Sequence, residues 1–259
     1  MRVDVQDELD RYPHTGRFLM GRLRDAMSDE EKQTVEALVE DVEDLRDGEM
    51  VIERGAVCDK STMLIEGFIL RTIGMGDKRF VVGIQVPGDY VDLHGFALKR
   101  LDHDVVAVGN ARVGYTPHPR IKQLMKDNAH LARLLWFSTL LDAAIHREWI
   151  MKLEQLRASK RAAHIFCEIQ HRLEFVGLGD ANIVETPLIQ QDLADMCGTT
   201  AIHMNRALGE LRKARLADFR RGKVIVPDRE ELARYATFDP TYLYGDGILG
   251  MRGELDLST

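Results

Sequence analysis

The sequence predicts an α+β fold in consecutive parts: a β-rich N-terminal domain, a long helix, and a C-terminal domain of short helices with a β-hairpin. Two observations predict this order. Short β-type segments separated by glycine turns fill residues 49–115, and a helical period of apolar residues then continues from about residue 128 to 156. The length of 259 residues suits two domains, since a domain commonly has on the order of 100 to 200 residues.

The composition pattern places the domain boundaries near residues 127 and 158. Residues 1–127 are expected to form the β-rich domain with helices at its N-terminus. Residues 128–158 are expected to form the long helix, and residues 159–259 the C-terminal domain with a tail.

Residues 5–45 are predicted to be helical. Ser28 followed by Glu31 fits a capping box, in which each end of the pair satisfies an N–H group of the other. Apolar residues then recur at helical spacing, namely Val35, Leu38, Val39, Val42 and Leu45. Gly48 is expected to end this helical stretch.

From Glu49 onward the apolar residues occur in short runs that suit strands. The runs are 50–52, 63–65, 68–70, 80–86, 105–108 and 112–115. Glycine-containing segments that include Gly67, Pro87–Asp89 and Gly109–Asn110 are expected to be the turns between them. Regularly spaced short strands without intervening helices favour a sandwich or rolled barrel over a parallel α/β sheet.

The long helix is predicted from one apolar stripe with steps of three or four residues. The stripe is Leu134, Phe137, Leu141, Ile145, Trp149, Leu153 and Leu156. A helix from about Asn128 to Leu156 would be roughly 43 Å long, which exceeds what a small β domain can cover. Either it packs between domains or it pairs with its copy in a homodimer, with Leu134, Leu141, Ile145 and Trp149 at the dimer interface. Ser159 is expected to cap the next helix, 160–175.

Residues 190–208 have the spacing of a helix-turn-helix. The first helix needs a small residue where the second crosses it, and Ala194 supplies one. The turn needs a residue that tolerates positive φ, which Gly198 does. Leu193, Met196, Met204 and Leu208 are the inward-facing apolar residues, and Thr199 or Thr200 is expected to cap the second helix.

A β-hairpin with a basic tip is predicted directly after the second helix. Residues 215–219 and 224–227 flank the tip, which is Arg220, Arg221, Gly222 and Lys223. Such a hairpin beside a helix-turn-helix is a wing, and its cations suit phosphate contacts. The net charge of −7 is unevenly distributed: residues 187–226 hold seven Lys/Arg and four Asp/Glu, whereas residues 1–53 hold sixteen Asp/Glu and seven Lys/Arg.

The first turns of the second helix reach base edges in helix-turn-helix proteins that bind DNA. The candidate DNA-binding residues are therefore Gln190, Gln191, Thr199, Thr200, Ala201, His203, Asn205, Arg206, Arg220, Arg221 and Lys223. Arg206 is the best candidate for a bidentate contact to guanine, because a planar guanidinium can reach O6 and N7 together.

The order of these parts resembles the Crp/Fnr family of bacterial transcription regulators over nearly the whole chain. The matching residues are Pro87-Gly88-Asp89-Tyr90, the Leu134–Leu156 stripe, and the segment from Gln191 through Gly198 to Leu208. The resemblance implies a cyclic-nucleotide-binding-like β-roll (jelly-roll-like) as sensor, a dimerisation helix and a winged helix-turn-helix. It also implies a bacterial, cytoplasmic homodimer that binds palindromic double-stranded DNA. If the protein activates transcription, the resemblance implies RNA polymerase as a further partner.

The sequence departs from that family at the effector site and at the start of the second helix. Cyclic-AMP binders carry a Glu for the ribose and an Arg for the phosphate, where this chain has Leu93 and Asp102-His103. An acidic residue would repel a phosphate, so cyclic AMP is not expected as effector, and the effector stays unknown. A pocket, if present, is expected around Tyr90, Asp92, Leu93, His94, Asp102 and His103. Ala201-Ile202 stands where the family has an Arg-Glu pair. Of the family's contacts to bases, only the one made by Arg206 is therefore expected in this chain. Ile189 stands where a Thr often caps the first helix.

Several other classes of function are disfavoured. The cysteines Cys58, Cys167 and Cys197 are odd in number and far apart, which suits buried apolar positions rather than disulfides. His94, His103 and His118 form no H-x-H or H-x-x-x-H pair and are expected to be scattered surface residues, so neither a metal nor a cofactor is expected. No P-loop or G-x-S-x-G motif suggests an enzyme. No apolar run approaches the roughly 18 residues of a membrane span.

An alternative function is a ligand-sensing or protein-interaction module whose helix-turn-helix no longer binds DNA. Salt-dependent binding to one palindromic DNA sequence would separate the two hypotheses, because phosphate contacts release counterions.

Overall fold

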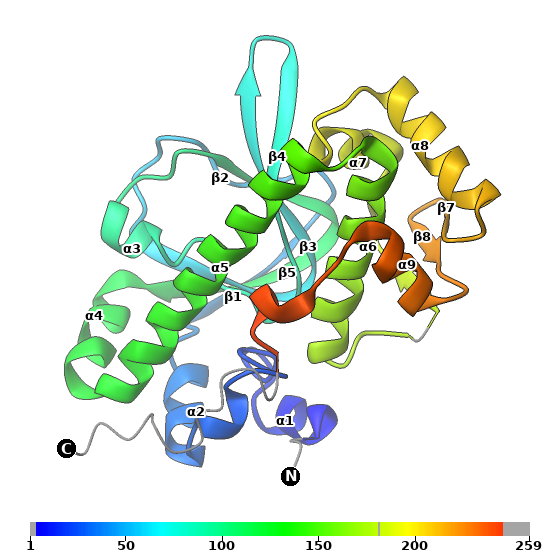
Figure 1. Ribbon diagram of the computed structural model, residues 1–259. Helices are drawn as coiled ribbons and strands as arrows, with labels where there is room; N and C mark the ends of the chain where they lie inside the picture. Colours follow the sequence, from blue (N-terminus) through cyan, green and yellow to red (C-terminus); the bar gives the residue numbers. More distant parts are fainter. Residues whose placement is uncertain (1–3, 181, 246–259) are drawn as a thin grey trace.

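The structure is a computed structural model that describes residues 4–180 and 182–245. An antiparallel β-roll and a helical C-terminal domain lie side by side, and the long helix α5 (Ala129–Gln155) runs diagonally across the roll to the C-terminal domain (Figure 1). The N-terminal helices lie below the roll in this view. Within the described ranges, no helix is sufficiently long and apolar to cross a membrane.

The N-terminal segment contains helices α1 (Val5–Arg11), η1 (Arg24–Ala26) and α2 (Asp29–Glu36). The expected capping box is present at the start of α2, where the Ser28 hydroxyl accepts from the Glu31 N–H and the Glu31 carboxylate accepts from the Ser28 N–H. The prediction of helix up to residue 45 is wrong. Residues Asp41–Leu45 form strand β1, because pairing with β5 satisfies their backbone groups.

The β-roll is built from β1, β2 (Met50–Ile52), β3 (Lys60–Met75), β4 (Lys78–Gln85) and β5 (Asp104–Pro117). The sheet order is β1-β5-β3-β4, all antiparallel, and β2 also pairs with β5. A short helix, α3 (Gly95–Leu98), follows the Pro87–Asp89 turn.

Two of the expected turns are bulges inside long strands. The runs 63–65 and 68–70 both belong to β3, and the runs 105–108 and 112–115 both belong to β5. Gly67 and Gly109 have positive φ values of 83° and 65°, and the β3–β5 register shifts near Gly67. A Cβ at Gly67 would lie 2.3 Å from the Asn110 carbonyl oxygen, so only glycine fits where the strands bend.

Helix α4 (His118–Asp127) leads into α5, whose expected position is confirmed. The Asn128 side chain caps α5 by accepting from the Leu131 N–H at 2.8 Å. The expected dimer residues Leu134, Leu141, Ile145 and Trp149 are buried within the chain itself. Their assignment to a surface seam is therefore wrong: the roll, the N-terminal segment and the C-terminal domain cover this face of α5.

The C-terminal domain contains the helices α6 (Ala158–Phe175), α7 (Gln190–Met196), α8 (Ala201–Lys213), α9 (Arg229–Ala236) and η2 (Pro240–Leu243). A sheet of order β6-β8-β7 completes it, with β6 at Ile183–Glu185, β7 at Asp218–Arg220 and β8 at Lys223–Ile225. Helix α6 begins one residue after Arg157, so Ser159 is not its cap. Ser159 is buried, and its hydroxyl oxygen accepts from the Tyr235 hydroxyl at 2.9 Å.

Candidate nucleic-acid interface

Helices α7 and α8 form the predicted helix-turn-helix. Ala194 is fully buried at the crossing, and Gly198 adopts a φ of 57° in the turn, as the spacing required. The Thr199 N–H donates to the Ala194 carbonyl at 3.0 Å, and the Gln190 side-chain amide donates to the Ala201 carbonyl at 3.0 Å. These bonds hold the turn and the start of α8 against α7.

The two sides of α8 differ sharply in polarity. Met204, Ala207, Leu208 and Leu211 face inward and are buried with Leu193 and Met196 of α7. The outward side exposes Ile202, His203, Asn205 and Arg206. Thr200 is the cap: its hydroxyl accepts from the His203 N–H at 3.3 Å. Thr199 and Ala201 are half-buried beside it, so the first turn of α8 is partly exposed.

The predicted wing is present, with its tip at residues 220–223. Arg221 and Gly222 both have positive φ, at 51° and 80°, as a tight two-residue hairpin turn requires. The Gly222 carbonyl accepts from the Thr186 N–H at 2.8 Å, which fixes the tip beside the segment that enters α7.

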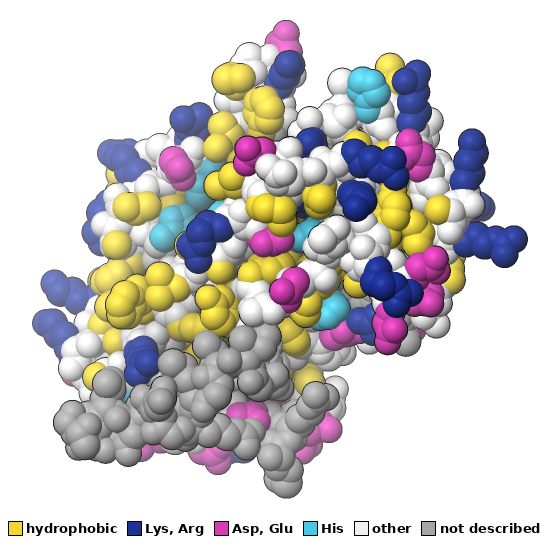
Figure 2. Space-filling view, viewed as in Figure 1, with side chains coloured by type: hydrophobic (Ala, Val, Ile, Leu, Met, Phe, Trp, Pro, Cys, Tyr) yellow, Lys and Arg dark blue, Asp and Glu magenta, His cyan; other side chains and the backbone are white. Residues whose placement is uncertain are grey.

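The wing cations differ in their partners. Arg220 pairs with Asp218 at 2.8 Å and Lys223 with Glu185 at 2.5 Å. Both cations are largely exposed, so water screens these pairs and each stabilises the free protein little. Arg206 and Arg221 form no ion pair with any residue that the structure describes. Figure 2 shows Lys and Arg side chains along the outer edge of the C-terminal domain, over α8 and the wing.

The acidic residues of α7 are neutralised by the β-roll, a contact that the sequence analysis missed. Arg79, on the β3–β4 hairpin, donates through Nε to Asp195 at 2.8 Å and pairs with Asp192 at 2.5 Å. Asp192 also accepts from the Ile189 N–H at 2.9 Å, which is the half of a capping box that the N3 residue supplies. Ile189 has no side-chain oxygen with which to supply the other half. Gln191 is exposed and donates to Asp195 at 2.7 Å.

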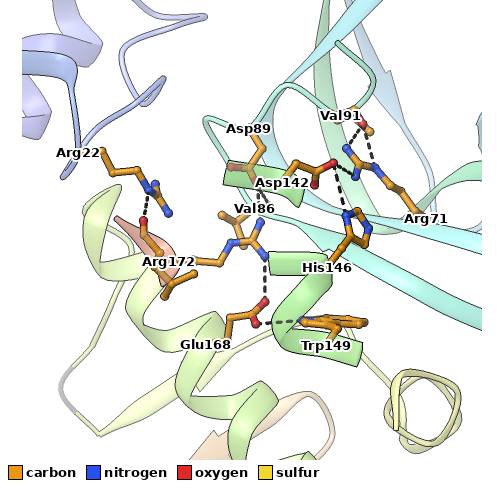
Figure 3. A network of polar contacts seen from close by, with 11 residues as sticks. Arg22, Arg71, Val86, Asp89, Val91, Asp142, His146, Trp149, Glu168 and Arg172 are labelled. Carbon is orange, nitrogen blue, oxygen red and sulfur yellow. Dashed lines mark hydrogen bonds and ion pairs between the residues drawn. The ribbon is translucent and has the colours of Figure 1, made fainter. Parts of the chain in front are cut away.

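A buried polar network joins the roll, α5 and α6 (Figure 3). Arg172 of α6 pairs with Asp89 in the Pro87–Asp89 turn at 2.6 Å and with Glu168 at 3.3 Å. Glu168 also accepts from Trp149 Nε1 of α5 at 2.9 Å and from the Tyr242 hydroxyl at 2.8 Å. The network thus connects the roll to both the long helix and the C-terminal domain.

The residues of the expected effector pocket lie in varied environments. Tyr90, Asp92, Leu93 and His103 are buried, His94 is half-buried, and Asp102 is exposed. Asp92 accepts from the Thr62 N–H at 2.5 Å, and burial raises the pKa of Asp92 to about 7. Of the six, Tyr90 lines a cavity between the roll, α5 and α6. The pocket therefore stays a prediction.

Arg71 of β3 reaches across this region to the long helix. It donates through Nε to the Val91 carbonyl at 3.0 Å and pairs with Asp142 of α5 at 2.5 Å (Figure 3). Arg71 thereby connects the roll to α5, beside the residues that were expected to bind an effector.

The prediction of scattered surface histidines is wrong for the roll. His103 and His118 are buried, and the His94 and His103 rings lie 5.5 Å apart. His103 Nδ1 donates to the Asp102 carboxylate at 2.8 Å, and His118 Nε2 lies 3.2 Å from the Ser61 hydroxyl. Burial lowers the pKa of His94 to about 4. The described residues contain no group of three or more His, Cys, Asp or Glu that could hold a metal ion.

A β-roll, a long helix and a winged helix-turn-helix in one chain define the class of fold. Residues 160–235 match the model of the Crp-like helix-turn-helix domain. FixK2 from Bradyrhizobium japonicum is similar in structure, with a TM-score of 0.69 and 18% identity over 75% of this chain and 96% of its own. A CRP/FNR-family transcriptional regulator from Thermus thermophilus gives a TM-score of 0.58 and 17% identity, over 76% of this chain and 99% of its own.

The c-di-GMP-responsive global regulator CLP from Xanthomonas campestris gives a TM-score of 0.58 and 15% identity, over 75% of this chain and 98% of its own. No curated protein matches the sequence. The chain therefore carries a Crp-like helix-turn-helix domain within the fold of Crp/Fnr regulators.

Proposed function

We propose that the protein is a transcriptional regulator that binds a palindromic DNA operator as a homodimer. The observation that carries the proposal is the outward side of α8, where Asn205 and Arg206 are exposed beside a basic wing. A recognition helix of this kind enters the major groove with its first turns against the base edges. Arg79 supports the same function, because it neutralises the two carboxylates of α7 that would otherwise repel DNA.

Dimerisation is proposed through the exposed side of α5, not through the buried stripe. Trp136, Leu140, Ala143, Arg147 and Ile150 recur at steps of four and three residues along that side. This is the spacing of the seam of a two-stranded coiled coil, in which apolar side chains of one helix insert between those of the other. Trp136, Leu140 and Ile150 are each at least half exposed in the single chain, and a second copy would cover them.

The roles proposed for α8 and the wing can be separated by salt dependence. Arg206→Ala should cost about 1–3 kcal/mol per half-site on the selected operator and far less on random DNA, because it removes base contacts. Arg221→Ala should weaken binding to both DNAs alike and flatten the salt slope by about one per lost phosphate contact. Arg234→Ala is the control, since Arg234 is also exposed but lies on α9.

Binding would be measured by fluorescence anisotropy between about 50 and 200 mM salt, a range in which phosphate contacts change affinity strongly. Equal losses on operator and random DNA for Arg206→Ala would contradict base readout by Arg206. Unchanged binding for both variants would contradict the whole DNA interface.

A further inference from the structure

Ile202 is the large apolar side chain on the outward side of α8. It is 68% exposed, although it lies in the first turn of a helix whose other large apolar residues, Met204, Leu208 and Leu211, are buried. It precedes Arg206 by four residues, so the two side chains are neighbours on one side of the helix. Single exposed apolar residues are common on proteins, and the meaning of this one comes from its position in the turn that faces the groove.

The chemistry of the major groove restricts what an isoleucine can recognise there. Its side chain has no hydrogen-bond donor or acceptor, and the apolar group that base pairs present in this groove is the C5 methyl of thymine. Against a G·C pair, the isoleucine would displace water from the cytosine amine and the guanine O6 without replacing their hydrogen bonds. That loss is unfavourable because unpaired polar groups retain their desolvation penalty.

The neighbours of Ile202 leave it free to approach a base. The Thr200 hydroxyl is occupied as the helix cap, and Met204 and Ala207 point into the domain. Arg206, one turn further on, pairs with no described residue and offers a guanidinium suited to guanine.

We propose that Ile202 determines sequence specificity by contacting the C5 methyl of one thymine in each half-site, beside the guanine that Arg206 reads. The inference rests on the proposed operator binding and extends it to a particular base. The half-site therefore contains an invariant thymine within a helical turn of the Arg206 guanine.

Deoxyuridine provides a direct test, since it differs from thymidine by this one methyl group. Each thymine of the selected operator would be replaced in turn by deoxyuridine, symmetrically in both half-sites. Replacement at one of these positions should weaken wild-type binding about fourfold per half-site. This is the loss expected when one methyl-sized group is no longer buried, which costs about 0.8 kcal/mol. In the Ile202→Ala protein the same replacement should have no effect.

Ile225→Ala is the matched control, because Ile225 is also an exposed isoleucine of this domain but lies on the wing strand β8. This variant should keep the full deoxyuridine effect. Operator binding without any methyl-sensitive thymine, or with sensitivity that persists in Ile202→Ala, would overturn the inference and leave the proposed function standing. Failure to select any operator would overturn both.

Discussion

Replacing Arg172 by methionine tests the network that joins the β-roll to the C-terminal domain. The Arg172 side chain is 2% exposed and the Glu168 side chain 1%, so both charges are almost fully removed from water. Methionine fills a similar volume but leaves Glu168 and Asp89 without the guanidinium. Removing one partner of a buried ion pair costs about 3–5 kcal/mol, because the remaining charge is uncompensated.

The expected loss lies near the lower end of that range, about 3 kcal/mol, because Glu168 retains two hydrogen bonds from Trp149 and Tyr242. The double variant Arg172→Met/Glu168→Gln should recover about half of the loss, since a neutral amide needs no counter-charge. Urea denaturation, monitored by tryptophan fluorescence, measures the free energy of unfolding of both variants. Trp149 lies within the network and can report on it.

Two results would refute this reasoning. A loss below about 1 kcal/mol for Arg172→Met would mean that the pair behaves like a solvent-screened surface contact. A double variant less stable than Arg172→Met would mean that the carboxylate of Glu168 is not the source of the penalty.

The remaining predictions concern the dimer, the pH dependence and the interdomain contact. Ile150→Asp should give monomers by sedimentation velocity, whereas Val57→Asp, an equally exposed position in the roll, should remain dimeric; a dimeric Ile150→Asp would place the interface elsewhere. Burial, and then the charge of Lys152, lower the pKa of His164 to about 4, although His164 lies 3.2 Å from Glu148. The unfolded chain takes up this proton at about pH 6.5, so the wild type should lose about 1.4 kcal/mol of stability per pH unit from there down to about pH 4 relative to His164→Gln. Parallel stability curves for the two proteins would contradict the assignment. Arg79→Ala should accelerate amide exchange in α7 at a cost of under about 1 kcal/mol, since Arg79 is partly exposed; unchanged α7 exchange would show that the contact does not form in solution.

The helix-turn-helix could be predicted from the sequence because its requirements are local. Ala194 at the crossing, Gly198 in the turn and Met204 facing inward occupy fixed offsets within one short segment, and the structure places each as expected. The wing could be predicted for the same reason, since Gly222 and its basic neighbours mark a tight turn shortly after α8.

The roll was predicted less accurately because its strands depend on distant partners. Gly67 and Gly109 look like turns in the sequence, yet pairing between β3 and β5 carries both strands through them as bulges. Residues 41–45 have a helical period, but β5 offers them a partner that no local pattern reveals.

The long helix shows a different limit of sequence analysis. Periodicity identified the apolar stripe of Ile145 and Trp149 but not the surface that covers it, and the covering groups come from the same chain. The contacts of Arg172 with Asp89 and of Arg79 with Asp192 join residues 83 and 113 positions apart, so sequence spacing could not indicate them.

Selection of DNA from a random pool by the full-length protein tests the central claim most directly. The account predicts a palindromic consensus whose half-site centres are one helical turn apart, about 34–36 Å, with a guanine and a thymine in each half-site. Binding to it should weaken steeply with salt, in proportion to the phosphates neutralised by two wings. Recovery of sequences without any shared consensus, or of a single asymmetric site bound by one protein chain, would contradict the account.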